Sequence, residues 1–416
     1  MVSAPQRRAG GTGHREFAMM HQAKVVVVGG GPAGLTAALA LAAAGVETAL
    51  VAAKPRPDNR TTALHRASIA ALTTLGAWAR CRDAAAALRT MRIIDDTRRL
   101  IRAPEVTFHA TDIGHEAFGF NVENRRLVAA LEARAAECPA FTRVEDTAAA
   151  VELGESATIQ LTGGGHVQAR LAVAADGRHS FLREAAGIDI DRHSYPQTAL
   201  ALNFRHTRPH ENVSTEFHTE TGPFTLVPLP GLRSGLVCVV DPDAAAALSR
   251  LDDAELAREI EHRSHSILGK ITVEPERGVF PLERATARAF AAQRVALVGE
   301  TAHVIPPIGA QGLNLGLRDA AMISELVVAA HRTGADVGSD DLLRRYDQAR
   351  RADIASRTLA VDLLNLSLLT DFLPVQGLRG FGLYLLGQVA PLRRAVMREG
   401  IAPSAGTPRL MRGEAL

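Results

Sequence analysis

Three glycines near the N-terminus have the spacing of a phosphate-binding turn. Gly29, Gly31 and Gly34 form the pattern G-x-G-x-x-G between an apolar run and a helical segment. The first glycine permits a tight turn, the second lets a pyrophosphate approach the backbone, and the third lets helix and strand pack closely. The helix N-terminus adds about half a positive charge and free N–H groups. The motif predicts a bound dinucleotide, with plain strand–helix packing as the alternative.

The acid that usually follows such a turn by about 20 residues is missing. Counting along the second strand places Ala52 where a carboxylate would bind the ribose hydroxyls. We expect either that backbone groups and neighbours such as Lys54 or Arg60 hold the ribose, or that the nucleotide is held less tightly.

A second segment of interest is AADGRHSFLR, residues 174–183. It places Asp176 and Gly177 at the end of an apolar strand, followed by Arg178 and Ser180. Asp-Gly and Ser also form ordinary turns and helix caps. This segment alone is therefore compatible with a ligand-binding turn and with a purely structural one.

The third segment is ALVGETAHVIPPIGAQGLNLGLRD, residues 296–319. Glu300 ends a strand at the carboxyl edge, where open α/β sheets bind ligands, and its carboxylate can accept hydrogen bonds from polyol hydroxyls. Pro306 and Pro307 form a rigid wall without N–H donors. This combination indicates a shaped binding turn.

The residues after this wall favour a flat ligand. Gly309 and Gly312 let backbone N–H groups approach it, and a helix begins at once with its positive end directed at the turn. A group that becomes anionic during turnover, such as a reduced flavin ring, would be stabilised there. We interpret His303 as a structural hydrogen-bonding residue rather than a base, and nothing near it has metal-ligand spacing.

The elements that must position these residues alternate between strand and helix. Lys24–Val28 is a β-branched run typical of a buried parallel strand, a helix runs from Pro32 to Gly45, and Val46–Val51 is a second strand, which makes a βαβ unit. We further expect an extended region at 88–110, a helix at 126–138, a hairpin and strand at 157–177, a sheet-rich module at 198–241, a strand at 294–299 and helices from Leu317 onward.

The composition limits the partners. A chain of 416 residues suggests roughly two domains. Its 47 basic and 45 acidic residues give a net charge of +2 and no field suited to nucleic acid. Cys81, Cys138 and Cys238 lack paired spacing, which argues against disulfides and thiolate metal sites and fits a reducing compartment. We expect a soluble or peripheral protein without a membrane span, with residues 1–22 as a disordered extension.

Together the three segments resemble a known family. VVVVGGGPAGL, VAADGRHSFLR and VALVGETAHVIPPIGAQGLNLGLRDA occur in the order and spacing of the FAD-dependent aromatic hydroxylases of the p-hydroxybenzoate hydroxylase fold. Within that group the chain is most similar to the ubiquinone-biosynthesis hydroxylases of the UbiH/UbiF type. The resemblance extends over nearly the whole chain from about Ala23, including RTTAL at 60–64 and NVENRRLVAAL at 121–131.

The resemblance assigns roles to individual residues. It implies that the glycine turn receives the FAD pyrophosphate, that Asp176 and Gly177 serve FAD and the nicotinamide donor, and that Glu300 stands where an aspartate usually binds the ribitol. The expected cofactor-binding residues are Gly29, Gly31, Gly34, Arg60, Arg125, Asp176, Gly177, Glu300, Pro307, Gly309, Gln311, Gly312 and Asn314. No catalytic side chain and no metal ligand is predicted.

Two further positions depart from the family pattern. Glu300 keeps the charge of the usual aspartate but lengthens its reach by one methylene, so ribitol contact requires a shift of the loop. Ala310 stands where glycine is usual, which is tolerable if its φ is negative.

The resemblance also implies a reaction. NAD(P)H reduces FAD, O₂ adds to the flavin C4a, and the hydroperoxide hydroxylates an electron-rich phenol, here a polyprenylated phenol of the 2-polyprenyl-6-methoxyphenol type. The alternatives are a flavin hydroxylase of a soluble aromatic or polyketide substrate and a catalytically weak scaffold subunit of a biosynthetic complex. The ring position, the tail length, NADH versus NADPH and the oligomeric state stay open, and Arg205 and His218 are only guesses for substrate contacts.

The expected fold is α/β, with a Rossmann-like FAD-binding domain, an inserted and mainly antiparallel substrate domain, and a helical C-terminal region. We assign residues 23–80, 106–185 and 279–350 to the FAD-binding domain, 81–105 and 186–278 to the substrate domain, and 351–416 to the C-terminal region. The stretch at 363–400 is apolar and ends in arginines. It predicts either contact with the inner face of an anionic membrane, where other ubiquinone-biosynthesis proteins could be partners, or a helical cap in a cytoplasmic protein.

Overall fold

The computed structural model describes residues 20–55, 58–98, 102–369 and 406–416, together with 382, 389, 391, 393 and 394. The side chains of residues 308 and 356–369 are not described. Residues 1–19 of the expected N-terminal extension, and most of the apolar, basic stretch at 363–400, lie outside this description.

The molecule has two halves, and one of them is built on a mainly parallel sheet. Strand β1 (Met20–Val28) begins three residues before Ala23 and leads through helix α1 (Pro32–Ala43) to strand β2 (Thr48–Val51). Val25, Val26 and Val27 are fully buried because the sheet is covered on both faces. The predicted βαβ unit is confirmed.

The remaining strands of this sheet come from distant parts of the chain. They are β8 (Phe141–Val144), β11 (His166–Ala174), β18 (Val295–Leu297) and the short β17 (Ala291–Ala292), in the order β17-β18-β11-β1-β2-β8. The predicted hairpin is present, because β10 (Ala157–Leu161) pairs antiparallel with β11 and β9 (Ala148–Leu153) pairs with β10. The carboxyl ends of β1, β11 and β18 consequently meet at one edge.

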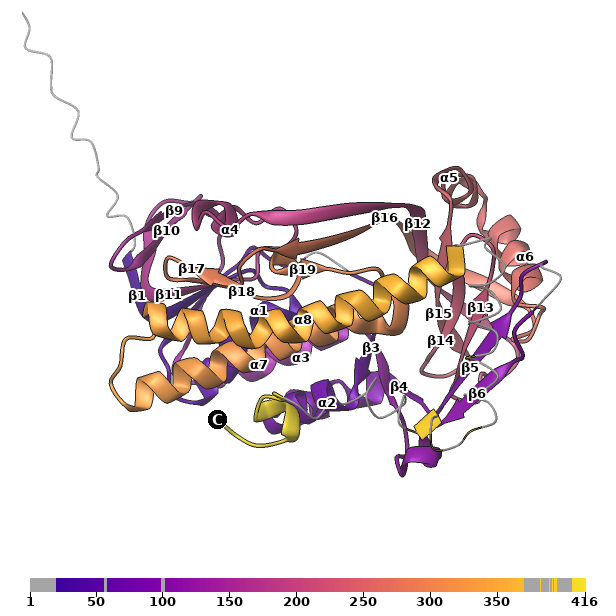
Figure 1. Ribbon diagram of the computed structural model, residues 1–416, viewed down its shortest axis with the longest axis horizontal. Helices are drawn as coiled ribbons and strands as arrows, with labels where there is room; N and C mark the ends of the chain where they lie inside the picture. The colour runs from indigo at the N-terminus through magenta and orange to yellow at the C-terminus, as the bar shows by residue number, and fades with distance from the viewer. Residues whose placement is uncertain are drawn as a thin grey trace, which may run out of the picture.

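Helices cover this sheet. Helix α1 contacts both α3 (Asn124–Ala135) and α7 (Gln311–Arg332), and α7 lies beside the long α8 (Asp340–Leu369) (Figure 1). Shorter helices are α2 (Arg66–Thr74) and α4 (Phe181–Ala185), and a 3-10 turn at Leu410–Arg412 packs on α2. Within the described residues, no helix is both long and apolar enough to cross a membrane.

A second sheet is built mainly from antiparallel strands. Its order is β19-β16-β12-β15-β14-β13-β5-β6, with one parallel pair between β13 and β5. The strands are β5 (Thr90–Asp95), β6 (Val106–His109), β12 (Ile190–His206), β13 (Val213–His218), β14 (Pro223–Leu229), β15 (Arg233–Val240), β16 (Ile271–Ala287) and β19 (His303–Val304). Helices α5 (Pro242–Arg250) and α6 (Asp253–Arg263) cover one of its faces.

Strands β12 and β16 are 17 residues each and connect the two halves of the molecule (Figure 1). They pair antiparallel from Ile190 with Ala287 at one end to His206 with Ile271 at the other. A three-stranded sheet of β3 (Thr61–His65), β7 (Gly119–Glu123) and β4 (Ala85–Leu88) lies between the halves. The predicted fold class, with a parallel α/β domain, an inserted antiparallel sheet and C-terminal helices, is confirmed.

Candidate functional site

The glycine turn has the geometry expected of a phosphate site. Gly29 has φ +119°, and a Cβ on it would lie 2.1 Å from the carbonyl oxygen of Ala175. A Cβ on Gly34 would lie 2.1 Å from the carbonyl oxygen of Gly29, so both positions require glycine. Gly31 differs, because a Cβ there would meet nothing within 4 Å. Gly31 precedes α1 and thus leaves open space in front of the free N–H groups of the helix, which fits a pyrophosphate.

An arginine lies beside Ala52, the position where the usual acid is missing. Arg143 comes from β8, and its Nη2 donates to the carbonyl oxygen of Ala53 at 3.1 Å. A Cβ on Gly30 would lie 2.9 Å from the Ala52 methyl and 3.7 Å from Arg143 Nη1. Lys54, one expected substitute, pairs instead with Glu145 at 3.5 Å.

The Asp-Gly turn lies directly against the third segment. Thr301 Oγ1 accepts a hydrogen bond from Gly177 N at 2.9 Å and donates to Asp176 Oδ1 at 3.3 Å. Gly177 has φ +87°, which favours glycine. Burial raises the pKa of Asp176, although hydrogen bonds from Ser180, Leu182 and Thr301 partly oppose the shift. The two motifs therefore form one unit at the edge shared by β11 and β18.

Glu300 lies in the 3-10 turn Gly299–Thr301, just beyond β18. Its side chain is 54 % exposed and accepts hydrogen bonds from Arg178 Nε at 3.1 Å and Nη2 at 3.2 Å. A Cβ on Gly299 would lie 3.2 Å from the Ala33 methyl, so this turn also touches the start of α1. The structure thus brings Glu300, Asp176 and the glycine turn to one edge of the sheet, as expected.

His303 belongs to a buried charge network behind this edge. Its Nε2 donates to Asp319 Oδ2 at 2.7 Å, and the same oxygen accepts from Gly299 N at 2.9 Å. Arg350 Nε donates to Asp319 Oδ1 at 2.6 Å. Burial alone would raise the pKa of Asp319, but the positive charge of Arg350 and the contacts with His303 and Gly299 hold it below its usual value. This geometry agrees with the structural role expected for His303.

The turn before α7 departs from expectation at one residue. Gly309 has φ +67° and Ala310 has φ +51° and ψ +34°, so both adopt the left-handed conformation. The condition of a negative φ at Ala310 is not met, because this residue immediately precedes Gln311, the first residue of α7, and makes the turn into that helix. A Cβ on Gly312 would meet nothing within 4 Å, and Pro307 is exposed on the same turn.

Asn314 ties this turn to the three-stranded sheet. Its Oδ1 accepts from His65 N at 2.8 Å and from Ser68 Oγ at 2.7 Å. Its Nδ2 donates to the carbonyl oxygens of Ala63 at 2.9 Å and Ala310 at 2.7 Å. The side chain is buried and both of its polar atoms are occupied, so it positions the turn through the protein itself.

Arg60 and Arg125 are joined through one acidic residue. Arg60 donates to Asp58 through Nε at 2.9 Å and Nη2 at 2.8 Å, and its guanidinium lies 5.4 Å from the centre of the Phe280 ring. Arg125 N donates to the carbonyl oxygen of Asp58 at 3.2 Å, while its side chain pairs with Glu123 at 3.2 Å. The pKa of Arg60 is raised, mainly by its hydrogen bond to Asp58. The negative charge of Glu300 adds to this increase.

One face of the second sheet contacts the segments that carry Asn59 and Glu123. Asn203 Nδ2 donates to the carbonyl oxygen of Asn59 at 2.8 Å, and Arg233 Nη2 lies 3.2 Å from Glu123. Of the two guessed substrate contacts, Arg205 is mostly exposed and pairs with Glu274 at 3.6 Å. His218 is buried and its Nε2 lies 2.8 Å from Glu216 Oε1. Neither contact distinguishes a substrate role from a structural one.

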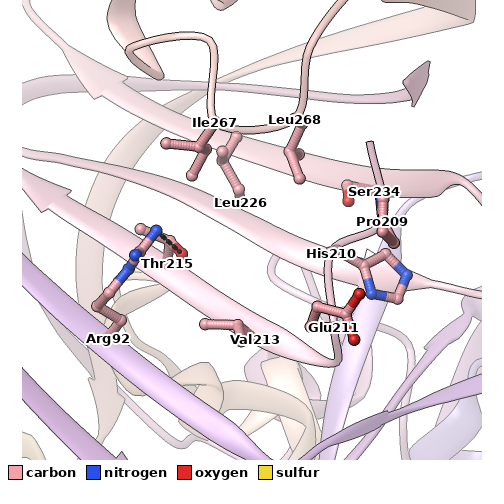
Figure 2. Close-up of a pocket in the computed structure, with 10 residues that line it drawn as sticks. All are labelled: Arg92, Pro209, His210, Glu211, Val213, Thr215, Leu226, Ser234, Ile267 and Leu268. Atoms are coloured by element: carbon pink, nitrogen blue, oxygen red, sulfur yellow. Dashed lines mark hydrogen bonds between the residues drawn. The ribbon is translucent and has the colours of Figure 1, made fainter. Parts of the chain in front are cut away.

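A cavity of about 180 Å³ lies on the opposite face of this sheet (Figure 2). Its lining includes Ser234, which alternates along β15 with the inward-facing Arg233, and Leu226, which packs in the core under α5 and α6. Because strand neighbours point to opposite faces, this cavity is separate from the edge that carries the three motifs.

The site has the parts of an FAD-binding monooxygenase, and comparison with known proteins supports this reading. Residues 22–360 match the FAD binding domain family. The chain belongs to that family of FAD-dependent monooxygenases. It is 35 % identical over 405 residues to the ubiquinone hydroxylase UbiL of Rhodospirillum rubrum, covering 94 % of this chain and 93 % of that protein. It is 30 % identical over 389 residues to the 3-demethoxyubiquinol 3-hydroxylase of Escherichia coli, covering 90 % and 97 %.

Solved structures of FAD-dependent monooxygenases share the fold. The p-nitrophenol 4-monooxygenase PnpA of Pseudomonas putida superposes with a TM-score of 0.76 at 20 % identity, covering 91 % of this chain and 97 % of that one. PqsL of Pseudomonas aeruginosa, in complex with 2-aminobenzoylacetate, gives 0.76 at 21 % identity, covering 88 % and 100 %. The enzyme class and the FAD cofactor expected from the sequence are confirmed.

Proposed function

We propose that this monooxygenase hydroxylates the aromatic ring of a polyprenylated phenol in ubiquinone biosynthesis, as a 2-polyprenyl-6-methoxyphenol hydroxylase does. The observation that carries the proposal is the 35 % identity to a ubiquinone hydroxylase over 94 % of the chain and 93 % of that relative. The second relative, at 30 % identity, is by its name a 3-demethoxyubiquinol 3-hydroxylase. Two relatives named for ubiquinone compounds favour a prenylated phenol over a soluble aromatic or polyketide substrate.

The residues at the sheet edge would hold FAD. Gly29, Gly31 and Gly34 would receive the pyrophosphate, and Glu300 would accept hydrogen bonds from the ribitol. Bound FAD, reduced by NAD(P)H, supplies the reduction of O₂ that hydroxylation needs. NAD(P)H would approach transiently along the Asp176–Gly177 turn, which the hydrogen bonds to Thr301 hold in place.

The chain's own contribution is to orient the ring and exclude water. The turn at Pro307, Gly309 and Gly312 would face the flat ring, with the positive N-terminal end of α7 behind it. Asn314 fixes that turn to β3 and α2 through three hydrogen bonds, and a fourth joins it to Ala310 within the turn. The inner face of the second sheet would then cover the ring and the phenol.

Membrane contact and protein partners belong to the same proposal. A polyprenyl tail partitions into lipid, so we propose a peripheral location on the inner face of the membrane, close to other ubiquinone-biosynthesis proteins. The support is the basic, apolar composition of the stretch at 363–400. The backbone of residues 363–369 belongs to α8, and most of the rest of that stretch lies outside the described residues.

Deletion of the gene in its own host tests the function. We expect loss of ubiquinone and accumulation of a prenylated phenol that lacks one ring hydroxyl, with the mass of the intermediate identifying the step. Complementation with the native chain should restore ubiquinone, whereas a Gly29→Val variant, whose side chain would collide with Ala175, should not. Normal ubiquinone in the deletion strain, in a host without a second hydroxylase, would refute the proposal.

A further inference from the structure

We propose that Arg143 replaces the missing acid and binds the ribose of the FAD adenosine through its guanidinium N–H groups. The inference rests on FAD binding, which the family establishes, and does not depend on the identity of the aromatic substrate. It concerns the end of the cofactor that lies farthest from the reacting ring.

The strand register places Arg143 at the correct edge. Strands β2 and β8 run parallel, with Leu50 opposite Arg143 and Val51 opposite Val144. Ala52, the residue that follows β2, donates from its N–H to the carbonyl oxygen of Val144 at 3.2 Å. Arg143 therefore lies one strand away from the position of the missing acid, at the same carboxyl edge of the sheet.

The guanidinium lies beside the glycine turn. Nη1 and Nη2 of Arg143 lie 3.7 and 3.9 Å from the point that a Cβ on Gly30 would take. The Ala52 methyl lies 2.9 Å from that same point. An acidic side chain at position 52 would extend from the place of the Ala52 methyl, next to the guanidinium of Arg143. With alanine at position 52, Arg143 supplies a polar side chain next to the turn.

Arg143 is paired within the protein but keeps one N–H donor. Its Nη1 is buried and forms an ion pair with Glu132 Oε1 at 3.2 Å. Its Nη2 carries two N–H groups and donates one of them to the carbonyl oxygen of Ala53. Because the side chain is 24 % exposed, the second N–H of Nη2 is the donor that we assign to an acceptor brought by the ligand.

Replacing an acid by an arginine reverses the chemistry of the ribose contact. A carboxylate accepts hydrogen bonds from ribose hydroxyls and repels a phosphate on them. A guanidinium donates to the hydroxyl oxygens and attracts a phosphate at the 2′ position. The adenosine end of this site should consequently tolerate, and even favour, a 2′-phosphorylated adenosine.

The first test compares FAD with FMN, which lacks the adenosine. In the full-length protein, Arg143→Met should raise the FAD dissociation constant about ten-fold, measured from the fluorescence of released flavin. The FMN constant of the same variant should change less than about two-fold. Glu132→Gln, which removes the nearby carboxylate but keeps the guanidinium, is the matched control and should leave FAD binding unchanged or tighter.

A second test rebuilds the usual acid. The double variant A52E/R143M should recover most of the lost FAD affinity. Adenosine 2′,5′-bisphosphate should displace FAD from the native protein at lower concentration than 5′-AMP does, and this order should reverse in the double variant. A melting temperature measured with and without FAD separates loss of folding from loss of binding.

Three results would overturn the inference. They are an unchanged FAD constant in Arg143→Met, an equal loss of FAD and FMN in that variant, and a preference of the native protein for 5′-AMP. None of them would affect the proposed hydroxylation, which is judged from the accumulated intermediate. Conversely, normal ubiquinone in a deletion strain would leave the Arg143 contact standing.

Discussion

Arg178 holds the carboxylate of Glu300 with two hydrogen bonds, from Nε at 3.1 Å and from Nη2 at 3.2 Å. The pair connects the Asp-Gly turn to the strand-end acid, two segments far apart in sequence. Glu300 reaches this guanidinium from the 3-10 turn beyond β18. The contact orients the carboxylate at the edge where we place the ribitol.

Glu300→Ala should weaken FAD binding, because the ribitol loses its acceptor. We expect purified Glu300→Ala protein to contain less FAD per chain, with a dissociation constant raised about ten-fold. Glu300→Asp should retain more cofactor, since it keeps the charge. An FAD content equal to that of the native protein in Glu300→Ala would refute the role of this residue. Arg178→Met removes the side chain that orients the Glu300 carboxylate and serves as the control. Its FAD dissociation constant should lie between those of Glu300→Asp and Glu300→Ala.

Ala310→Gly should stabilise the protein. The left-handed conformation at φ +51° costs an L-residue with a Cβ about 1 kcal/mol, and glycine adopts it without that cost. Part of the gain is offset by the greater freedom of glycine in the unfolded chain. We expect a net rise of about 0.5 kcal/mol in the free energy of unfolding, measured by urea titration of the FAD-loaded protein. A loss of stability would show that the turn does not keep this conformation in solution.

Asn314→Ala should destabilise the turn before α7. It removes the Asn314 side chain as the partner of the half-buried His65 N, the buried Ser68 Oγ and the carbonyl oxygens of Ala63 and Ala310. We expect a loss of about 2 to 3 kcal/mol in the free energy of unfolding. Asn314→Asp keeps the acceptor but removes both donors, and should be similarly destabilised. A change below about 0.5 kcal/mol in the free energy of unfolding of Asn314→Ala would contradict the role of Asn314 in holding the turn.

Asp319 should make stability depend on pH in the acidic range. Its pKa is lower in the folded protein than in the unfolded chain, so below about pH 4 the unfolded state binds more protons. Stability from this group is therefore complete above about pH 5 and is lost as pH falls through the folded pKa. Urea titrations at several pH values between 3 and 7 would measure the decline.

Asp319→Asn is the matched variant for that measurement. It removes the charge that compensates the buried Arg350, and should cost about 3 to 5 kcal/mol at pH 7. Its free energy of unfolding should then decline less between pH 5 and 3 than that of the native protein. The same pH dependence in both proteins would assign the acid sensitivity to other carboxylates.

The main elements of the fold were predictable because their signals are local. The valine run of β1, the glycine turn and the start of α1 identify a βαβ unit without any knowledge of the rest of the chain. The meeting of Gly29, Asp176 and Glu300 was also predictable, since the ends of parallel strands share one edge. The β12 and β16 pairing was visible only as extended sequence, because register is set by partners far along the chain.

The details of the site were less predictable. The sign of φ at Ala310 was open from the sequence, and only the path from Pro307 into α7 makes it positive. Arg143 gave no signal, because β8 lies about 90 residues after Ala52 and becomes its neighbour only through the sheet. Asn314 has the family's position in the motif, but its four internal hydrogen bonds come from β3, α2 and the turn. Contacts between segments distant in sequence decide each of these cases.

The two 17-residue strands that join the halves of the molecule have a mechanical consequence. A single linker would let the second sheet move away from the cofactor, whereas two hydrogen-bonded strands resist bending. β16 is further anchored by its pairing with β19, which carries His303 at the third motif. We therefore expect the two halves to act as a stiff frame, so that the substrate enters and leaves through movement of surface loops and not by a hinge opening between domains.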